Sequence, residues 1–410
     1  MTPNAKVVFL HVGCRKSGTT TLQLGLRLAA DTLREAGVEQ PLGARGGTMK
    51  GLVDPLRSAV AAGDISLARP AVTRLAALVR ESPYDRHIVS LEALAEMPAE
   101  ATSLVVEALR EFDTQVIVTL RPWAFTIPSE WQQLVKSRFT GDYVGYAQAI
   151  AGRADTSELA CQSDAFHRRQ DVADVVTRWR AADPGLPVHV ILVPQGRETR
   201  PDLYDLFCQV VGLDPRLLVV PDRVVNPSIS HADAEVLRLL NDALGDKLAN
   251  TRGNYRYSVR NWIAVNAMMR GSSGTKIRLP HELEEWATRE TARQVAEVRD
   301  HGCEVLGDAE GFASPRLRGD DFVPATDAEV AEAAAAVLAN LAQRHDRQRR
   351  QERRRTKQLA RKRARKRART RQARAAAPTG SPAGRAARTV RSLRGRAATR
   401  LRNLRRRAGS

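Results

Sequence analysis

The chain has 410 residues, and its 65 lysines and arginines against 46 aspartates and glutamates give a net charge of +19. Residues 341–410 hold 27 basic and 2 acidic side chains, which leaves 38 basic and 44 acidic side chains for residues 1–340. The tail therefore carries +25 and the rest of the chain −6, so the basicity is no reason to class residues 1–340 as a nucleic-acid-binding protein. The length suits one large domain with an appendage.

Two further features exclude classes of protein. No run approaches the roughly 20 apolar residues that a membrane-spanning helix needs, and the residues after Met1 lack the apolar core and cleavage site of a secretory signal. We therefore expect a cytoplasmic protein, attached peripherally to the inner face of the membrane.

The four cysteines form neither a C-x-x-C pair nor a cluster with histidines at metal-ligand spacing, so the sequence predicts no metal site.

Short apolar runs rich in β-branched residues alternate with helical patterns over the first 220 residues. The predicted strands are 7–12, 87–91, 115–120, 188–193 and 217–220, and the predicted helices are 18–36, 101–112, 170–182 and 201–211. Runs that are apolar throughout and separated by amphipathic helices are typical of a parallel sheet covered on both faces. The sequence therefore predicts an α/β fold of three layers with a central parallel sheet.

From residue 230 the pattern is mainly helical. One helix is expected to start at a Ser230 N-cap and another to end at Gly302, followed by a short strand within 303–308. The predicted organisation is an α/β domain of residues 1–325, a long basic helix of 326–377, a flexible linker of 378–388 and a basic amphipathic helix or tail of 389–410.

The last predicted segment has leucines on one helical face and arginines on the others. Leu393, Leu401 and Leu404 recur at helical spacing, which is the pattern of a helix that lies on an anionic surface. We therefore expect an anionic membrane surface as the partner of the tail. Nucleic acid is the alternative partner, since the basic run at 347–371 would bind phosphates through charge alone.

Residues 7–26, VVFLHVGCRKSGTTTLQLGL, read as a buried strand, a loop and the start of a helix. A helix N-terminus presents free N–H groups and a partial positive charge, and therefore binds phosphate well. Nucleotide hydrolases place a lysine directly after the second glycine of such a loop. Here Thr19 follows Gly18, and the lysine of the loop, Lys16, stands two residues before Gly18. This position suits a ligand whose reactive group is attached to a 5′-phosphate better than it suits a Mg²⁺-bound triphosphate.

The string HVGCRKSGTTTLQ resembles the 5′-phosphosulfate-binding loop of sulfotransferases, particularly the bacterial members. The residues that match the family motif are Lys16, Ser17, Gly18, Thr19 and Thr20, and we add the neighbouring Arg15 to the predicted cofactor-binding set. The resemblance implies a P-loop-like form of the three-layer fold. It also implies 3′-phosphoadenosine 5′-phosphosulfate as the sulfuryl donor.

A second segment, VIVTLRPWAFTIPSEW, is similar to the 3′-phosphate-binding element of the same family. Arg121 stands at the end of a predicted strand, and Ser129 follows eight residues later on a helix. A terminal phosphate carries nearly two charges and favours a guanidinium together with a hydroxyl donor. The resemblance covers roughly residues 5–310, and its two motifs stand in the order that the family requires.

The resemblance also implies where the catalytic groups lie. In the family, a His or Glu near the end of the strand that follows the loop takes the proton of the acceptor. Glu92 is the predicted base here, with Ser90 as a cofactor contact or orienting group and His11 as the next candidate. Lys16 is the predicted group that neutralises the charge on the leaving phosphate. This chemistry needs no metal.

The sequence therefore predicts a sulfotransferase that moves a sulfuryl group to a hydroxyl or amine acceptor, with glycans and glycolipids among the candidate acceptors. Two alternatives stay open. A P-loop kinase would need an aspartate at a strand end to hold Mg²⁺, which the segments VSLEAL and VTLRPW do not offer. A non-catalytic nucleotide-binding scaffold with a polyanion-binding tail would bind the cofactor without turnover.

Overall fold

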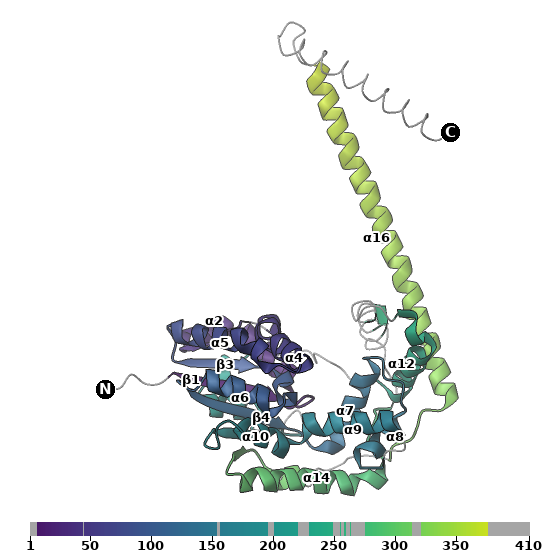
Figure 1. Ribbon diagram of the computed structural model, residues 1–410. Helices are drawn as coiled ribbons and strands as arrows, with labels where there is room; N and C mark the ends of the chain where they lie inside the picture. Colours follow the sequence, from purple (N-terminus) through teal and green to yellow (C-terminus); the bar gives the residue numbers. More distant parts are fainter. Residues whose placement is uncertain are drawn as a thin grey trace, which may run out of the picture. The chain divides into compact units, whose positions relative to one another are not determined.

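Six strands in the described part of the chain form one parallel sheet (Figure 1). They are β1 (Val7–Gly13), β2 (Val38–Glu39), β3 (Arg86–Ser90), β4 (Asp113–Leu120), β5 (Val188–Leu192) and β6 (Glu304–Leu306). Their spatial order is β2-β3-β1-β4-β5-β6, and every neighbouring pair is parallel. The computed structural model describes residues 6–43, 45–153, 156–195, 201–219, 229–248, 255, 258–259, 263, 275–313 and 321–375.

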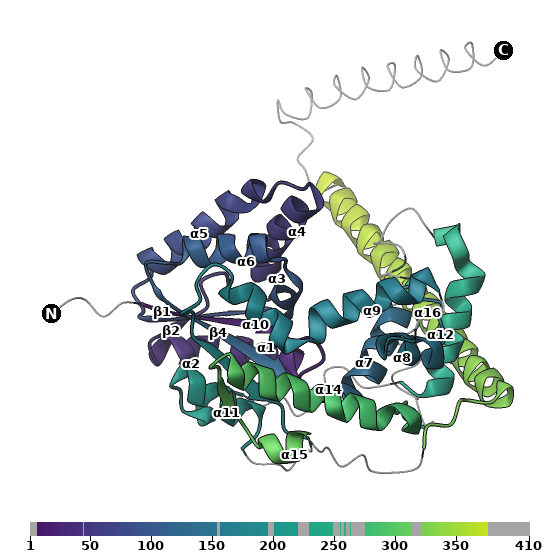
Figure 2. The ribbon, with the colours of Figure 1, turned by 60° about the horizontal axis from the view of Figure 1, so that its bottom comes forward.

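Helices cover both faces of the sheet because successive side chains of each strand point to opposite sides. Val8, Leu10 and Val12 of β1 lie in a core cluster with α5 (Arg69–Glu81), α6 (Ala99–Ala108) and α10 (Val172–Arg180). On the other face, Phe9 packs in a cluster with α1 (Thr19–Leu28), α2 (Ala30–Glu35) and α11 (Leu203–Val211) (Figure 2). The predicted α/β class and the central parallel sheet between helical layers are confirmed.

A second group of helices follows β4 and β5. It comprises α7 (Trp123–Val135), α8 (Tyr143–Ile150), α9 (Ser157–Gln170), α12 (His231–Leu244) and α14 (His281–Asp300). The aromatic side chains of Trp123, Trp131 and Tyr143 are buried there. The predicted N-cap of α12 is confirmed, since the Ser230 side chain accepts the backbone N–H of Asp233.

The remaining elements are short, apart from the last one. They are α3 (Arg45–Thr48), η1 (Met49–Val53), α4 (Asp54–Ala61), η2 (Ile65–Ala68), η3 (Glu92–Glu96), η4 (Pro215–Leu217), η5 (Gly245–Leu248), α15 (Ala309–Ala313) and α16 (Asp327–Ala375). None of the helices in the described ranges combines the length and the apolarity that crossing a bilayer requires.

The sequence predictions differ from the structure in three places. The strand predicted at 217–220 is wrong for the described residues, because Asp214 caps a 3₁₀ helix at Pro215–Leu217. The helix predicted at 18–36 is two helices that meet at Ala29. The short strand β2 was not predicted, since two residues carry no periodic pattern. The predicted strand within 303–308 is present as β6.

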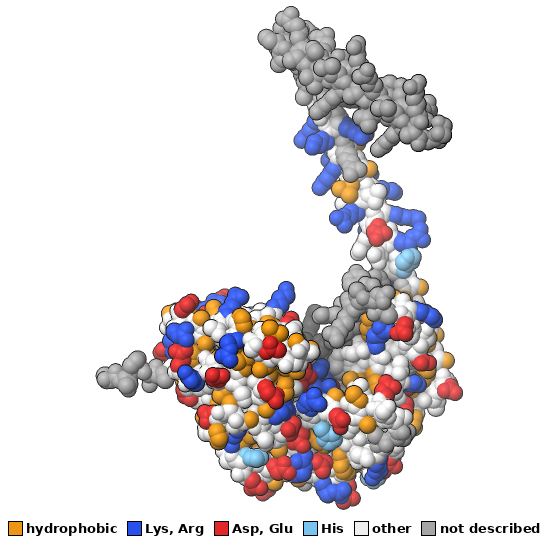
Figure 3. Space-filling view, viewed as in Figure 1, with side chains coloured by type: hydrophobic (Ala, Val, Ile, Leu, Met, Phe, Trp, Pro, Cys, Tyr) orange, Lys and Arg blue, Asp and Glu red, His pale blue; other side chains and the backbone are white. Residues whose placement is uncertain are grey.

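The chain divides into two units, Met1–Leu338 and Ala339–Ser410. The first unit extends past the domain end predicted at 325 and includes the first turns of α16. Figure 3 shows acidic and basic side chains interspersed on the visible face of the first unit, whereas the side chains along the later part of α16 are mostly basic. The predicted linker 378–388 and the predicted amphipathic segment 389–410 lie outside the described residues.

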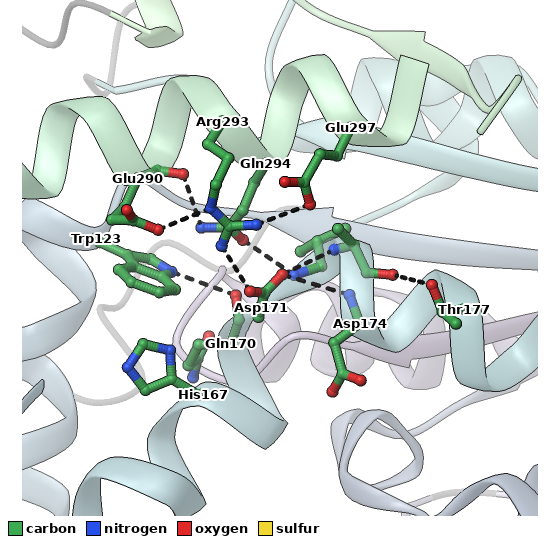
Figure 4. A network of polar contacts seen from close by, with 12 residues as sticks. Trp123, His167, Gln170, Asp171, Asp174, Thr177, Glu290, Arg293, Gln294 and Glu297 are labelled. Atoms are coloured by element: carbon green, nitrogen blue, oxygen red, sulfur yellow. Dashed lines mark hydrogen bonds and ion pairs between the residues drawn. The ribbon is translucent and has the colours of Figure 1, made fainter. Parts of the chain in front are cut away.

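A network of polar contacts fixes α14 against the junction of α9 and α10 (Figure 4). The Arg293 guanidinium donates to Asp171 at 2.6 Å, and it also pairs with Glu290 and Glu297 one turn away on its own helix. Asp171 in turn caps α10 by accepting backbone N–H groups of its first turn. One arginine thus joins the junction to the helix that packs beside it.

Two buried hydrogen bonds complete this junction. Gln294 of α14 accepts the backbone N–H of Val172 at 2.9 Å. The indole of Trp123, at the start of α7, donates to the backbone carbonyl of Gln170, at the end of α9, at 3.3 Å. The orphan N–H at the start of α10 and the last carbonyl of α9 are therefore both satisfied by side chains from other helices.

We predict that Gln294→Leu lowers the free energy of unfolding by about 1 to 3 kcal/mol, because the N–H of Val172 then stays buried without an acceptor. Urea unfolding of the full chain measures this change. The control is Glu285→Leu on the exposed side of the same helix, which should change the free energy by no more than about 0.5 kcal/mol. Equal effects of the two substitutions would contradict the role assigned to Gln294.

Candidate functional site

The candidate site lies at the carboxyl ends of β1 and β4, where the chain turns toward opposite edges of the sheet. The connection after β1 leads to β2 at one edge, and the connection after β4 leads to β5 on the other side. Ligands of open α/β sheets bind in the crevice outside the strand ends at such a point. Both sequence motifs follow these two strands, so the topology brings them together.

The loop after β1 joins the sheet to the N-terminus of α1. The backbone N–H of Cys14 donates to the carbonyl of Thr119 at 2.9 Å, which continues the pairing with β4 beyond Gly13. Gly18 is the N-cap residue with a φ of 84°, a left-handed conformation that glycine adopts without strain. Among the described residues, no side chain caps this helix, so its first N–H groups are left for a ligand.

The side chains of the loop point in different directions. Lys16 donates from Nζ to Oε1 of Gln133 on α7 at 3.1 Å. Ser17 is buried, and its hydroxyl donates to the Cys14 carbonyl and bonds the hydroxyl of Thr119, both at 2.5 Å. The Ser17 side chain therefore supports the loop from inside and is not exposed to a ligand. Thr19 is also buried.

Gly18 and Thr20 are the more accessible members of the predicted set, since Gly18 is exposed and Thr20 is half-buried. The backbone carbonyl of Arg15, also half-buried, accepts Nε2 of Gln170 at 3.1 Å. The same amide nitrogen donates to the buried Glu130 at 3.2 Å. Gln170 thus connects the loop to the group of helices that follows β4.

The second motif meets the loop directly. Nη1 of Arg121 donates to Oγ of Ser129 at 3.2 Å and to the backbone carbonyl of Lys16 at 3.3 Å. The guanidinium carbon lies 5.6 Å from the ring centre of Phe125, within the range of a cation–π contact. The structure therefore brings together the predicted strand-end arginine, the predicted helix serine and the predicted loop.

The Arg121 guanidinium is a partly buried cation whose hydrogen-bond acceptors are neutral. Burial lowers the pKa of Arg121 to about 10, which leaves the side chain protonated at neutral pH. Within the described ranges, no carboxylate forms an ion pair with it. Desolvating a charge without an opposite charge is costly, so this environment favours an anionic ligand.

Glu92 and Ser90 lie at the end of β3, on the other side of β1. Nε2 of Gln23 donates to Oε2 of Glu92 at 3.0 Å and to the carbonyl of Ser90 at 3.3 Å. The Ser90 hydroxyl bonds Nδ1 of His11 at 2.7 Å. A Cβ atom on Gly13 would lie 3.1 Å from the Glu92 backbone. The absence of a side chain at Gly13 therefore allows Glu92, the predicted base, to lie close to the start of the loop.

The predicted site residues did not include four polar residues that position these groups, although Gln23 and Thr119 stand within the two motif strings. They are Gln23 beside Glu92, Thr119 beside Ser17, Gln133 beside Lys16 and Gln170 beside Arg15. The sequence carries a signal for Gln23, because it follows Thr19 by four residues and therefore lies on the same face of α1. The other three come from β4, α7 and α9, and their proximity depends on the fold.

A cavity of about 360 Å³ lies away from these groups. It is lined by the start of α12, residues 323–325 and the first turns of α16, and by none of the predicted site residues. Among its lining residues, His231 accepts the backbone N–H of Ala325 through Nδ1 at 2.8 Å. This bond requires a neutral imidazole with its proton on Nε2.

Comparisons with family models, with curated proteins and with solved structures gave no match. The functional interpretation of the site therefore rests on its motifs and its geometry.

We predict that His11 makes the fold sensitive to acid. Burial lowers the pKa of His11 from 6.5 to about 4, although the charge of Glu92 acts in the opposite direction. Between these pH values the unfolded chain binds the proton and the folded chain does not, so stability falls as the pH falls. The loss from pH 7 to pH 4.5 should be about 2 to 3 kcal/mol.

The measurement is the free energy of urea unfolding at both pH values for the wild type and for His11→Gln. The variant should lose less stability on acidification by roughly that amount, whereas the exposed control His301→Gln should behave like the wild type. An identical acid-dependent loss in His11→Gln would show that His11 does not contribute.

Proposed function

We propose that this protein is a sulfotransferase of P-loop-like fold that uses 3′-phosphoadenosine 5′-phosphosulfate as its donor. The observation that carries the proposal is the environment of Arg121, a partly buried guanidinium without a carboxylate partner in the described part of the chain. It is 3.2 Å from the Ser129 hydroxyl and 3.3 Å from a carbonyl of the loop. The sequence motif and the geometry both favour an anion here.

Each half of the site suits one end of the donor. Arg121 and Ser129 offer a guanidinium and a hydroxyl to the 3′-phosphate. The uncapped N-terminus of α1 and the Lys16 ammonium offer backbone N–H groups and a positive charge to the 5′-phosphosulfate. The carbonyl of Lys16 accepts from Arg121, so the two halves are in direct contact.

The donor supplies an activated sulfuryl group, and residues of the chain supply the base and the positive charge for its transfer. Glu92 takes the proton of the acceptor hydroxyl or amine as its oxygen or nitrogen bonds to sulfur. The bond between sulfur and the bridging oxygen breaks, and Lys16 neutralises the charge that develops on that oxygen. Gln23 keeps the Glu92 carboxylate oriented through its 3.0 Å hydrogen bond. The products are the sulfated acceptor and adenosine 3′,5′-bisphosphate.

The acceptor, the location and the membrane partner complete the proposal. Hydroxyl groups of glycans or glycolipids are the acceptor class that we favour. We place the enzyme in the cytoplasm, at the inner face of the membrane, where residues 389–410 would contact acidic lipids. Labelled donor incubated with the protein and an extract of candidate acceptors would identify the acceptor.

We predict that the free protein binds adenosine 3′,5′-bisphosphate about ten- to hundredfold more tightly than 5′-AMP, because Arg121 and Ser129 contact the additional phosphate. This ratio corresponds to about 1.5 to 3 kcal/mol for a charge-assisted pair. Titration calorimetry measures both affinities. Equal affinities would contradict the proposal that Arg121 and Ser129 bind the 3′-phosphate. A requirement for Mg²⁺ would favour a kinase.

A matched test of this site compares Ser129 of α7 with Ser137, which follows the end of that helix. Ser129→Ala should weaken the binding of adenosine 3′,5′-bisphosphate and leave that of 5′-AMP unchanged, since only the first ligand reaches residue 129. The exposed Ser137 gives the control Ser137→Ala, which should alter neither affinity. A parallel loss for both nucleotides in Ser129→Ala would assign Ser129 a structural role.

We predict that Glu92→Gln lowers turnover by about a hundredfold or more while the affinity for adenosine 3′,5′-bisphosphate stays within twofold, because a general base acts in the transition state. The glutamine can still accept from Gln23, so the local fold is kept. Glu96→Gln, in the same 3₁₀ helix, is the control and should retain turnover. Full turnover by Glu92→Gln would move the role of base to another residue, with His11 as the next candidate.

A further inference from the structure

The later part of α16 is strongly basic and has no acidic residue. Residues 353–375, here called the basic segment, hold 13 lysines and arginines and no aspartate or glutamate. All 23 residues belong to one helix, and those with described side chains are exposed. The proposed sulfotransferase chemistry makes no use of this segment.

The positive charges of the basic segment lie on every side of the helix. Successive residues of an α-helix are about 100° apart around its axis. On this spacing, each quarter of the helix surface contains at least one of Arg353, Arg354, Arg355, Lys357, Arg361, Lys362, Arg365, Lys366, Arg367 and Arg369. Leu359 stands alone among alanines and polar residues, so the segment has no apolar stripe.

Positively charged side chains of this helix are four residues apart, a spacing at which they are neighbours on the helix surface. Arg353, Lys357, Arg361, Arg365 and Arg369 follow one another at intervals of four residues, and such pairs destabilise a helix when their charges have the same sign. The earlier part of α16 still contains an opposite-charge pair, Arg350 with Asp346 at 2.8 Å. After Glu352 the helix has no acidic residue of its own, so a polyanion that binds it would relieve this repulsion.

We propose that the basic segment binds duplex DNA by lying in the major groove. A 23-residue helix is about 35 Å long and about 10 to 12 Å across, which matches about one turn of B-DNA and a groove about 12 Å wide. Phosphates line both sides of that groove, so a helix with charge on every side contacts them from both flanks. Duplex DNA carries one charge per roughly 1.7 Å of its axis and can neutralise the whole segment.

Two other polyanions fit the segment less well. A helix that docks on a membrane buries an apolar face, and the basic segment has none. The major groove of duplex RNA is deep and narrow, so a whole helix does not enter it. The binding is expected to be independent of base sequence, since it depends on phosphate contacts alone.

The test is fluorescence anisotropy of a labelled 20-base-pair DNA titrated with the full chain at several salt concentrations. We expect binding that weakens steeply with salt. The variant Lys357→Gln, Arg361→Gln, Lys362→Gln, Arg365→Gln and Lys366→Gln should bind at least tenfold more weakly at 100 mM salt. Its slope of log K against log salt should be shallower by about 0.9 for each phosphate that the variant no longer neutralises.

The control removes five exposed arginines from the first unit by the substitutions Arg27→Gln, Arg69→Gln, Arg74→Gln, Arg110→Gln and Arg299→Gln. It should bind DNA like the wild type, although it loses the same number of charges. Unchanged binding by the basic-segment variant, or no binding by the wild type at 50 mM salt, would overturn the proposal. Vesicles with 30% phosphatidylserine that displace the DNA at equal phosphate concentration from the variant Leu393→Ser, Leu401→Ser and Leu404→Ser, which lacks the apolar residues proposed to contact lipid, would also overturn it, in favour of a membrane.

Discussion

The pairing of β1 with β4 is the constraint on which the candidate site depends. It aligns Gly13 with Val118, and the Cys14–Thr119 hydrogen bond carries the alignment into the loop. Because both strands run in the same direction, their ends release the loop and Arg121 at the same edge of the sheet. The contact between Arg121 and the Lys16 carbonyl then spans 105 positions of sequence. Without this register, the loop after β1 and Arg121 would not meet.

The local parts of the site could be predicted from the sequence, and the contacts between them could not. The segment 7–26 is a strand, a loop with glycines and a helix start, all encoded within about 20 residues. The meeting of Arg121 with Lys16 depends on strand order, which apolar periodicity does not specify. The orientation of Ser17 depends on Thr119 across the sheet, and for that reason a hydroxyl expected to contact the ligand turns out to support the loop.

The errors in the fold prediction have similar causes. The residues LLVV have a strong β propensity, but the turn formed by Asp214 and Pro215 places the first leucine in a 3₁₀ helix instead. The pair Val38 and Glu39 becomes a strand because β3 lies alongside it, with no signal in its own sequence. In both cases the neighbouring structure outweighed the local preference.

The two units have opposite charge and different kinds of surface. The first unit is mildly acidic and buries a large apolar core around the sheet. The second unit begins within α16 and carries the positive charge, and as far as residue 375, where the description of the chain ends, it has almost no apolar burial. The apolar core therefore belongs to the first unit and the excess of positive charge to the second.

The side chain of Gln170 couples the loop after β1 to the end of α9. Its side-chain amide nitrogen donates to the Arg15 carbonyl of the loop and to Glu130 of α7. Its backbone carbonyl accepts from the indole of Trp123. A molecule that displaces the end of α9 would therefore change the support of the loop after β1. Coupling of this kind is reciprocal, so a ligand that stiffens the loop would change the affinity of α9 for such a molecule by the same factor. One side chain is thus enough to make two separate surfaces of the first unit respond to each other.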